Sequence, residues 1–245
     1  MEDAYEELVR WYLRFNGYLY IDNFIVHEPN PTSTTVPQGA EIDILAVRFP
    51  FSRELISIKE VLRHETLEPP LPGMIDFVIA EVKARKKKIK LNKIWRNGDK
   101  EPYRNRVEYL VRWLGCLTSE SVISSVSSAL LKTHHARRGR YSFRVILFAE
   151  RSSQQSLPPT IRVITFEEIL QFILHNRANS FAKIGLGTRS QHSQWSPLIK
   201  DLWAIAETED SISEDEKMSR MSDLFRSRNP ARHAPDARSA DNGDE

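Results

Sequence analysis

Residues 77–85 read FVIAEVKAR and constrain this chain more than any other stretch. The run opens with apolar and β-branched residues, which is typical of a buried strand. It then places Glu81 and Lys83 two positions apart. Side chains at positions i and i+2 of a strand point to the same face, so we expect these two charges to lie together. Because charged groups at the end of a buried strand are costly, the pattern indicates a functional site. The alternative is an ordinary ion pair at a strand end.

A second acidic residue lies inside an earlier apolar run. Residues 41–49 read EIDILAVRF, which predicts a strand with Asp43 in its interior. Neighbouring strands lie about 4.8 Å apart, so Asp43 and Glu81 are candidates for adjacent positions. Two carboxylates this close repel each other unless a cation lies between them, and oxygen ligands suit Mg²⁺, with Mn²⁺ as an alternative. Lys83 beside them would orient an attacking water or stabilise charge on a phosphate.

The remaining patterns predict alternating helices and strands. Residues 3–16 form an amphipathic helix and residues 18–26 the first strand. After the strand with Asp43, an insertion spans residues 51–74, with a short helix near 59–62, and leads into the strand with Glu81. Further elements are helices over about 107–117 and 122–130, strands over 143–149 and 161–164, a helix from the capping box at Thr165 to about residue 176, and a helix from Pro197. This order predicts an α/β fold with a mixed central sheet flanked by helices.

The chain is long enough for one substantial core. Its 245 residues are 40% apolar, and we expect a main α/β domain over residues 1–180. Residues 181–207 are expected to form a C-terminal helical extension. Residues 208–245 are charged and poor in apolar side chains, which predicts a mostly disordered tail with some helix near residues 218–225.

Basic residues cluster directly after Lys83. The segment from Lys83 to Arg106 holds eleven Lys or Arg residues against Asp99 and Glu101. A backbone phosphate would have to approach just beyond the predicted site, so the cluster favours a polyanionic partner. The alternatives are a solvated charged face and a surface for an acidic protein. The candidate nucleic-acid contacts are Arg85, Lys86, Lys87, Lys88, Lys90 and Lys93.

Composition also bears on the cell compartment. Cys116 is the only cysteine, which excludes a disulfide framework and a thiolate zinc site. His134 and His135 have no partner at metal-ligand spacing, so both are expected to be ordinary surface histidines. The first residues are acidic, which argues against a secretory signal, and no apolar run is long enough to span a bilayer. We therefore expect a cytoplasmic protein without membrane contact.

The order of these residues and elements resembles a known superfamily. An acidic residue on one strand, followed by Glu-x-Lys on the next within a helix, strand, strand, strand, helix, strand order, is similar to the PD-(D/E)XK nucleases, which include restriction endonucleases and archaeal Holliday-junction resolvases. The resemblance covers roughly residues 4–150. It implies a restriction-endonuclease-like αβββαβ core, to which this chain adds C-terminal helices. It also implies that Glu6, with Glu7 as its nearest rival, completes the metal site, and that the backbone carbonyl of Val82 is a further ligand.

The activity implied by the resemblance is that of a Mg²⁺-dependent endonuclease acting on DNA. In this interpretation Glu6, Asp43 and Glu81 hold the metal and Lys83 positions the attacking water. The alternative is a catalytically inactive nucleic-acid-binding or assembly subunit with the same fold. The sequence leaves open whether the substrate is DNA or RNA and what its topology is. A double-strand cut needs two such sites, which is compatible with a homodimer.

Overall fold

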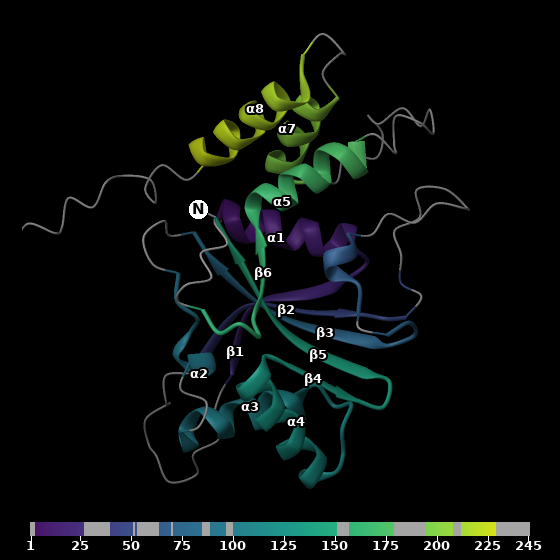
Figure 1. Ribbon diagram of the computed structural model, residues 1–245, viewed down its shortest axis with the longest axis vertical. Coiled ribbons are helices and arrows are strands. Elements are labelled where there is room, and N and C mark those ends of the chain that lie inside the picture. The colour runs from purple at the N-terminus through teal and green to yellow at the C-terminus, as the bar shows by residue number, and fades with distance from the viewer. Residues whose placement is uncertain are drawn as a thin grey trace, which may run out of the picture.

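A mixed sheet with helices on both faces forms the protein, as shown by a computed structural model (Figure 1). The structure describes residues 3–26, 40–50, 52, 64–69, 71–84, 89–96, 100–150, 157–178, 195–207 and 212–228. The strand order is β1-β2-β3-β5-β4, with β6 also paired to β5. Pairs β1/β2, β2/β3 and β4/β5 are antiparallel, whereas β3/β5 and β5/β6 are parallel. The strands are β1 (Leu19–Val26), β2 (Ala40–Arg48), β3 (Ile75–Lys83), β4 (His135–Arg138), β5 (Tyr141–Ala149) and β6 (Arg162–Thr165).

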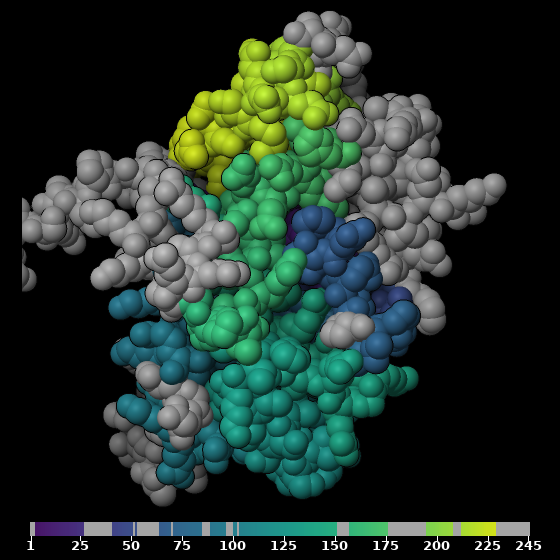
Figure 2. Space-filling model, in the orientation of Figure 1, coloured from purple at the N-terminus to yellow at the C-terminus, as the bar shows by residue number. Residues whose placement is uncertain are grey.

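Two separate hydrophobic cores cover the two faces of the sheet. The first core contains α1 (Ala4–Phe15), α5 (Phe166–Gln171) with its π-helical continuation Phe172–Ala178, α7 (Pro197–Ala206) and α8 (Glu214–Ser227). The second contains α2 (Lys93–Arg96), α3 (Glu101–Trp113) and α4 (Glu120–Thr133). Figure 2 shows α8 in yellow at one end of the molecule and the teal surface of the α3–α4 region at the other. The predicted α/β class with a mixed sheet flanked by helices is confirmed.

Strand β3 lies in the middle of the sheet and contributes side chains to both hydrophobic cores. Val78 and Ala80 belong to the core with α1, while Phe77 and Ile79 belong to the core with α3 and α4. This alternation is the period of a strand covered on both sides. It continues at Val82, which is again in the core with α1. The side chains of Glu81 and Lys83 therefore face the side of α2, α3 and α4.

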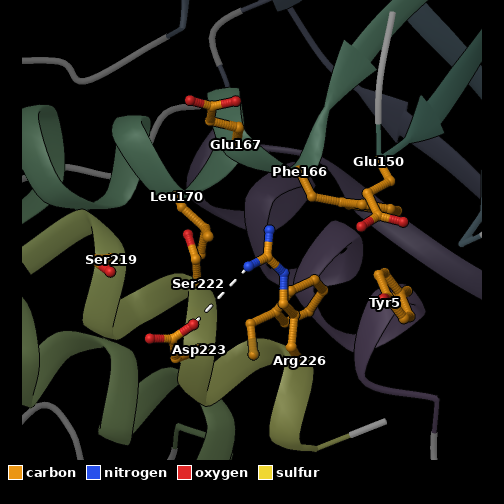
Figure 3. Close-up of a pocket in the computed structure, with 10 residues that line it drawn as sticks. Tyr5, Glu150, Phe166, Glu167, Leu170, Ser219, Ser222, Asp223 and Arg226 are labelled. Atoms are coloured by element: carbon orange, nitrogen blue, oxygen red, sulfur yellow. Dashed lines mark ion pairs between the residues drawn. The ribbon is translucent and has the colours of Figure 1, made fainter. Parts of the chain in front are cut away.

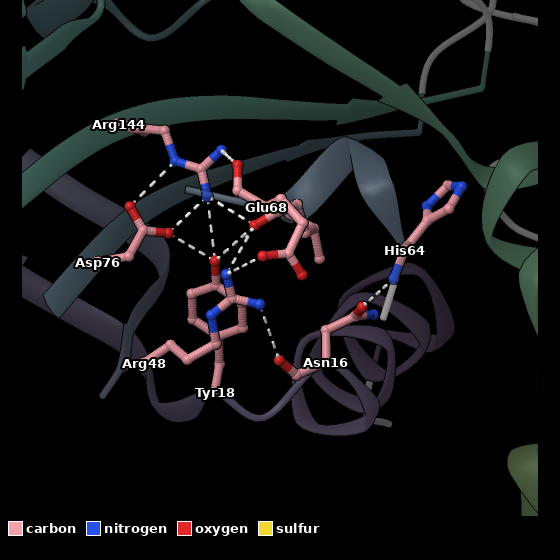
Figure 4. A network of polar contacts seen from close by, with 8 residues as sticks. Asn16, Tyr18, Arg48, His64, Glu68, Asp76 and Arg144 are labelled. Atoms are coloured by element: carbon pink, nitrogen blue, oxygen red, sulfur yellow. Dashed lines mark hydrogen bonds and ion pairs between the residues drawn. The ribbon is translucent and has the colours of Figure 1, made fainter. Parts of the chain in front are cut away.

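A buried polar network fixes the end of β3 that lies away from Glu81 (Figure 4). The Asp76 side chain is fully buried, and its Oδ1 and Oδ2 accept hydrogen bonds from Arg144 Nε at 3.1 Å and from Tyr18 Oη at 2.5 Å. The carbonyl oxygen of Leu67 accepts hydrogen bonds from Tyr18, Arg48 and Arg144. Leu67 belongs to the short 3₁₀ helix Glu65–Leu67, so the network ties the return of the insertion to three strands of the sheet.

The C-terminal helices α7 and α8 pack in the first core, together with α1. Helix α8 begins after the N-cap Ser213 and extends the helix expected near residues 218–225 to Glu214–Ser227. Its Met221 and Phe225 are buried in the core with α1, and the ring of Phe225 lies 4.7 Å from that of Tyr5. Residues three or four apart lie on one face of a helix, and the partly buried Met218 and Leu224 pack against the same core as Met221 and Phe225. The rest of the predicted tail, residues 208–211 and 229–245, lies outside the described residues.

Two features near residue 134 were not expected from the sequence. Residues His135–Arg138 form the strand β4, and the side chain of His134 is buried. His134 is only 3% exposed, so the expectation of a surface histidine is wrong for this residue and holds for the exposed His135. His134 is buried because it is the single residue between the end of α4 and the start of β4. Its Nδ1 lies 2.8 Å from Thr160 Oγ1. The helix expected near 59–62 lies outside the described residues. Within the described part of the chain, every helix is too short or too polar to cross a bilayer.

Candidate active site

Strands β2 and β3 separate at the place where the predicted charged residues lie. Their ladder includes the pair Ile44 and Ala80 and runs away from it toward Arg48 and Asp76. On the other side of that pair, residues 40–42 of β2 remain paired only with β1, and residues 81–83 of β3 remain paired with β5. The result is a fork in the sheet, which we call the strand fork. At a fork the backbone donors of the inner edges need new partners.

The side chain of Asp43 occupies the strand fork. Its Oδ2 accepts a hydrogen bond of 2.6 Å from the backbone N–H of Val82, in place of a ladder partner. The ammonium nitrogen of Lys83 lies 3.5 Å from Asp43 Oδ2 and 3.7 Å from Glu81 Oε2. The structure thus brings Asp43, Glu81 and Lys83 together, with the Lys83 ammonium within ion-pair distance of both carboxylates.

Glu81 is a buried carboxylate with an unused acceptor. Its side chain is 1% exposed, and Oε2 accepts a hydrogen bond of 2.9 Å from the backbone N–H of Asn92. Among the described residues, Oε1 has no hydrogen-bond partner. Burial raises the pKa of Glu81 to about 7, a rise that the Lys83 ammonium and the Asn92 N–H oppose and the Asp43 carboxylate adds to. The ionised form of Glu81 is therefore poorly solvated and would gain from a second cation.

Asn92 completes the site and was not predicted as a site residue. Its Oδ1 accepts a hydrogen bond of 3.1 Å from Lys83 Nζ, and its Nδ2 donates to the carbonyl oxygen of Glu41 at 3.5 Å. With the backbone contact to Glu81, one residue joins both arms of the strand fork. The signal in the sequence is an asparagine between the apolar Leu91 and Ile94, both of which are buried. Such a pattern fixes a polar side chain at the rim of a core.

Two of the predicted phosphate contacts lie next to Asn92. Lys90 and Lys93 are exposed, and neither forms an ion pair with an acidic residue in the described part of the chain. Lys93 begins α2, whose Ile94 and Trp95 are buried. The other four candidates, at positions 85–88, lie outside the described residues. The cations that are described are thus solvent-facing and within two residues of the site.

Glu6 lies on helix α1. It is half-buried in the first turn of α1, and that helix packs on the face opposite the one that Glu81 and Lys83 share. Among the described residues, no three His, Cys, Asp or Glu side chains are close enough together to hold one metal ion. The predicted group of Glu6, Asp43 and Glu81 is therefore not assembled, and the metal-binding role of Glu6, or of its neighbour Glu7, stays a prediction.

The remaining donors still fit a hard cation. Mg²⁺ is usually held by one or two carboxylates, with water and substrate phosphates in its other positions. Asp43 and Glu81 supply two carboxylates, and the unpartnered Oε1 of Glu81 is the buried acceptor that such an ion would satisfy. The backbone carbonyl of Val82 stays a predicted third ligand. Oxygen donors without sulfur or imidazole suit Mg²⁺ or Mn²⁺.

A cavity of about 380 Å³ lies elsewhere, between α1, α5 and α8 (Figure 3). It is on the side of the sheet opposite to Glu81 and Lys83. Tyr5, Phe166 and Phe225 form its apolar side, and Arg226 projects into it with Nη1 3.9 Å from Asp223 Oδ1. The cavity therefore shares no residue with the strand fork.

The fold and the geometry define an α/β protein with a charged site at a fork in its sheet. Comparisons of the chain with models of protein families, with curated proteins and with solved structures find no match.

Proposed function

We propose that the protein is a Mg²⁺-dependent nuclease of the PD-(D/E)XK type that hydrolyses phosphodiester bonds in DNA. The observation that carries the proposal is the convergence of Asp43, Glu81 and Lys83 at the strand fork, with a buried, unpartnered oxygen on Glu81. The topology supports it, because α1, the antiparallel β1 to β3, the intervening helices and the parallel β5 follow the order expected of an αβββαβ core.

In the proposed mechanism Asp43 and Glu81 hold the metal, with the Val82 carbonyl and Glu6 as further predicted ligands. A bound Mg²⁺ would polarise the phosphodiester and lower the pKa of a water molecule. Hydrolysis forms a bond from the water oxygen to phosphorus and breaks the bond to the leaving oxygen, which takes up a proton. The Lys83 ammonium orients the water and stabilises the negative charge that develops on the phosphate.

Asn92 and the neighbouring cations have supporting roles in this mechanism. Asn92 Oδ1 holds the Lys83 ammonium at 3.1 Å, so it acts as a positioning residue and does not touch the reacting atoms. Lys90 and Lys93, together with the predicted contacts at positions 85–88, would bind backbone phosphates on either side of the cut. Binding of this kind is independent of base sequence and weakens as salt rises.

A second candidate is a nucleic-acid-binding or assembly subunit without catalysis. The observation in its favour is that Glu6 does not join Asp43 and Glu81, so that no group of three acidic ligands forms among the described residues. This candidate predicts DNA binding that falls with salt and does not respond to divalent metal.

A cleavage screen separates the two candidates. Linear, supercoiled, branched and single-stranded DNA, with RNA as a further arm, is incubated with the protein in Mg²⁺, in Mn²⁺ and in EDTA. The nuclease proposal expects products only with metal, and at least a hundredfold loss of rate in Asp43→Asn, on the order found when a catalytic electrostatic group is removed.

The matched control is Asp22→Asn, since Asp22 is an acidic residue on the neighbouring strand β1 that pairs with Arg10 outside the strand fork. This control should cleave at the rate of the unmodified protein. Equal rates for Asp43→Asn and the unmodified protein would refute the assignment, and binding without cleavage on every substrate would favour the second candidate.

A further inference from the structure

A groove of about 260 Å³ lies between helix α4 and the edge strand β4. Its floor is apolar and includes Val122, Val126 and Ala136. Its rim carries two hydroxyl groups from α4 and two guanidinium groups from β4. These rim residues are Ser121, Ser125, Arg137 and Arg138. We call this feature the α4–β4 groove.

The α4–β4 groove carries uncompensated positive charge. Arg137 and Arg138 are exposed, and neither forms an ion pair with any acidic residue that the structure describes. Among the residues that the structure describes, no acidic side chain lines the groove. Glu120, the first residue of α4, is engaged by Arg112 at 2.5 Å. The rim thus offers hydrogen-bond donors and positive charge with no internal partner.

The walls of the groove are held rigidly. Helix α4 passes into β4 through His134, which adopts a left-handed backbone conformation with φ 58°. Its N–H donates to Leu130 O at 2.9 Å, its carbonyl accepts from Val145 N at 2.8 Å, and its Nδ1 lies 2.8 Å from Thr160 Oγ1. Because helix and strand are joined by one fixed residue, the backbones of α4 and β4, which carry the hydroxyl and guanidinium groups, keep their spacing. A ligand would meet a preformed site.

We propose that the α4–β4 groove binds a phosphate group of a nucleic-acid backbone. Guanidinium and serine hydroxyl groups are the donors that proteins commonly use for backbone phosphates. The N-terminal turn of α4, which contains Ser121, adds the positive end of a fourteen-residue helix. Lys132 and Arg140 are also exposed beside the groove. The positive charge therefore extends beyond the rim of the groove, which suits a polyanion better than a single small phosphate.

The α4–β4 groove is distinct from the strand fork. On β5, Arg137 and Arg138 pair with Ser142 and Tyr141, whereas Glu81 and Lys83 pair with positions 147 and 149. At about 3.3 Å per strand residue, the two sites are offset by roughly 20 Å along the direction of β5. That span corresponds to about six nucleotide steps of one DNA strand. The choice of DNA as the polyanion rests on the proposed function, while phosphate binding in the groove requires no metal and no cleavage.

The test is a titration of a labelled DNA duplex with the protein in EDTA. Binding is measured by fluorescence anisotropy at several salt concentrations. The double variant Arg137→Gln/Arg138→Gln should weaken binding about tenfold at low salt and reduce the slope of log K against log salt by about 1 to 2. Ser125→Asp, which places a negative charge on the rim, should also weaken binding. The matched control is Arg220→Gln/Arg226→Gln, which removes the same charge from exposed positions on α8 at the opposite face of the sheet and should have a smaller effect.

Three results would overturn the proposal. Unchanged binding in the Arg137→Gln/Arg138→Gln variant would mean that these residues only keep the open edge of β4 from pairing with other strands. An equal loss in the control would indicate diffuse charge attraction without a site. Competition by an acidic peptide, or by inorganic phosphate alone, that matches duplex DNA would assign the groove to a different ligand. Because all variants keep Asp43, Glu81 and Lys83, a protein that binds DNA through the groove without cleaving it would refute only the nuclease assignment.

Discussion

The substitution Glu81→Gln is expected to make the protein more stable at alkaline pH. Burial raises the pKa of Glu81 from its usual 4.5 to about 7, so the folded protein holds this proton more tightly than the unfolded chain does. Below pH 4.5 the carboxyl is neutral in both states and costs nothing. As the pH rises from about 4.5 to about 7, the unfolded chain ionises first, and the folded state of the unmodified protein loses stability. Each pKa unit is worth about 1.4 kcal/mol, so the loss is about 3 kcal/mol.

Urea unfolding at several pH values between 5 and 8, in EDTA, measures this effect. The free energy of unfolding of Glu81→Gln minus that of the unmodified protein should grow by about 2.5 kcal/mol over this range, because part of the loss has already occurred at pH 5, and should then stay constant. Glu41→Gln is the matched control, because Glu41 is an exposed carboxylate at the same fork. Its difference from the unmodified protein should not follow this course. If the free energy of unfolding of Glu81→Gln minus that of the unmodified protein were the same at pH 5 and pH 8, the assignment of Glu81 as a buried, poorly solvated carboxylate would be refuted.

Three further predictions concern the site and its support. Asn92→Ala should lower the cleavage rate about 10- to 100-fold at unchanged DNA affinity, and Asn92→Asp, which keeps an acceptor for Lys83, should recover part of it in single-turnover assays. Adding Mg²⁺ at 100 times its Kd should stabilise the unmodified protein by about 2.7 kcal/mol in thermal unfolding, and Asp43→Asn should lose this response. Asp76→Asn should lower the free energy of unfolding in urea by about 3 to 5 kcal/mol because it leaves the mostly buried Arg144 guanidinium without its carboxylate, while secondary structure by circular dichroism stays native below the melting temperature. An unchanged cleavage rate in Asn92→Ala would contradict the first prediction. A metal response that Asp43→Asn retains would contradict the second, and an unchanged urea midpoint in Asp76→Asn would contradict the third.

The patterns that predicted the fold correctly are local ones. Strand β3 was predicted from its apolar, β-branched run, and α1 from the spacing of Tyr5, Leu8, Tyr12 and Phe15, all of which are buried. These elements bury continuous stripes, so that periodicity alone identifies them. The proximity of Asp43 to Lys83 was also predictable, because it follows from two strands that are consecutive in the sheet.

The features that escaped prediction depend on contacts between distant parts of the chain. Asn92 enters the site only because its flanking apolar residues are held by the core around α3 and α4. Strand β4 is four residues long and mostly basic, so nothing in its own sequence favours a strand, and its pairing with β5 decides its conformation.

In the proposed function, Lys83, held between Asp43 and Glu81, serves phosphodiester hydrolysis. The most direct measurement is the rate of supercoiled plasmid cleavage in Mg²⁺ by the unmodified protein, by Lys83→Met and by Lys217→Met, a control on α8 at the opposite face of the sheet. Folding of all three is checked by circular dichroism. We predict metal-dependent cleavage by the unmodified protein and the control, and a loss of at least a hundredfold in Lys83→Met. Cleavage by Lys83→Met at the rate of the control would contradict the claim, as would the absence of cleavage by the unmodified protein on every substrate.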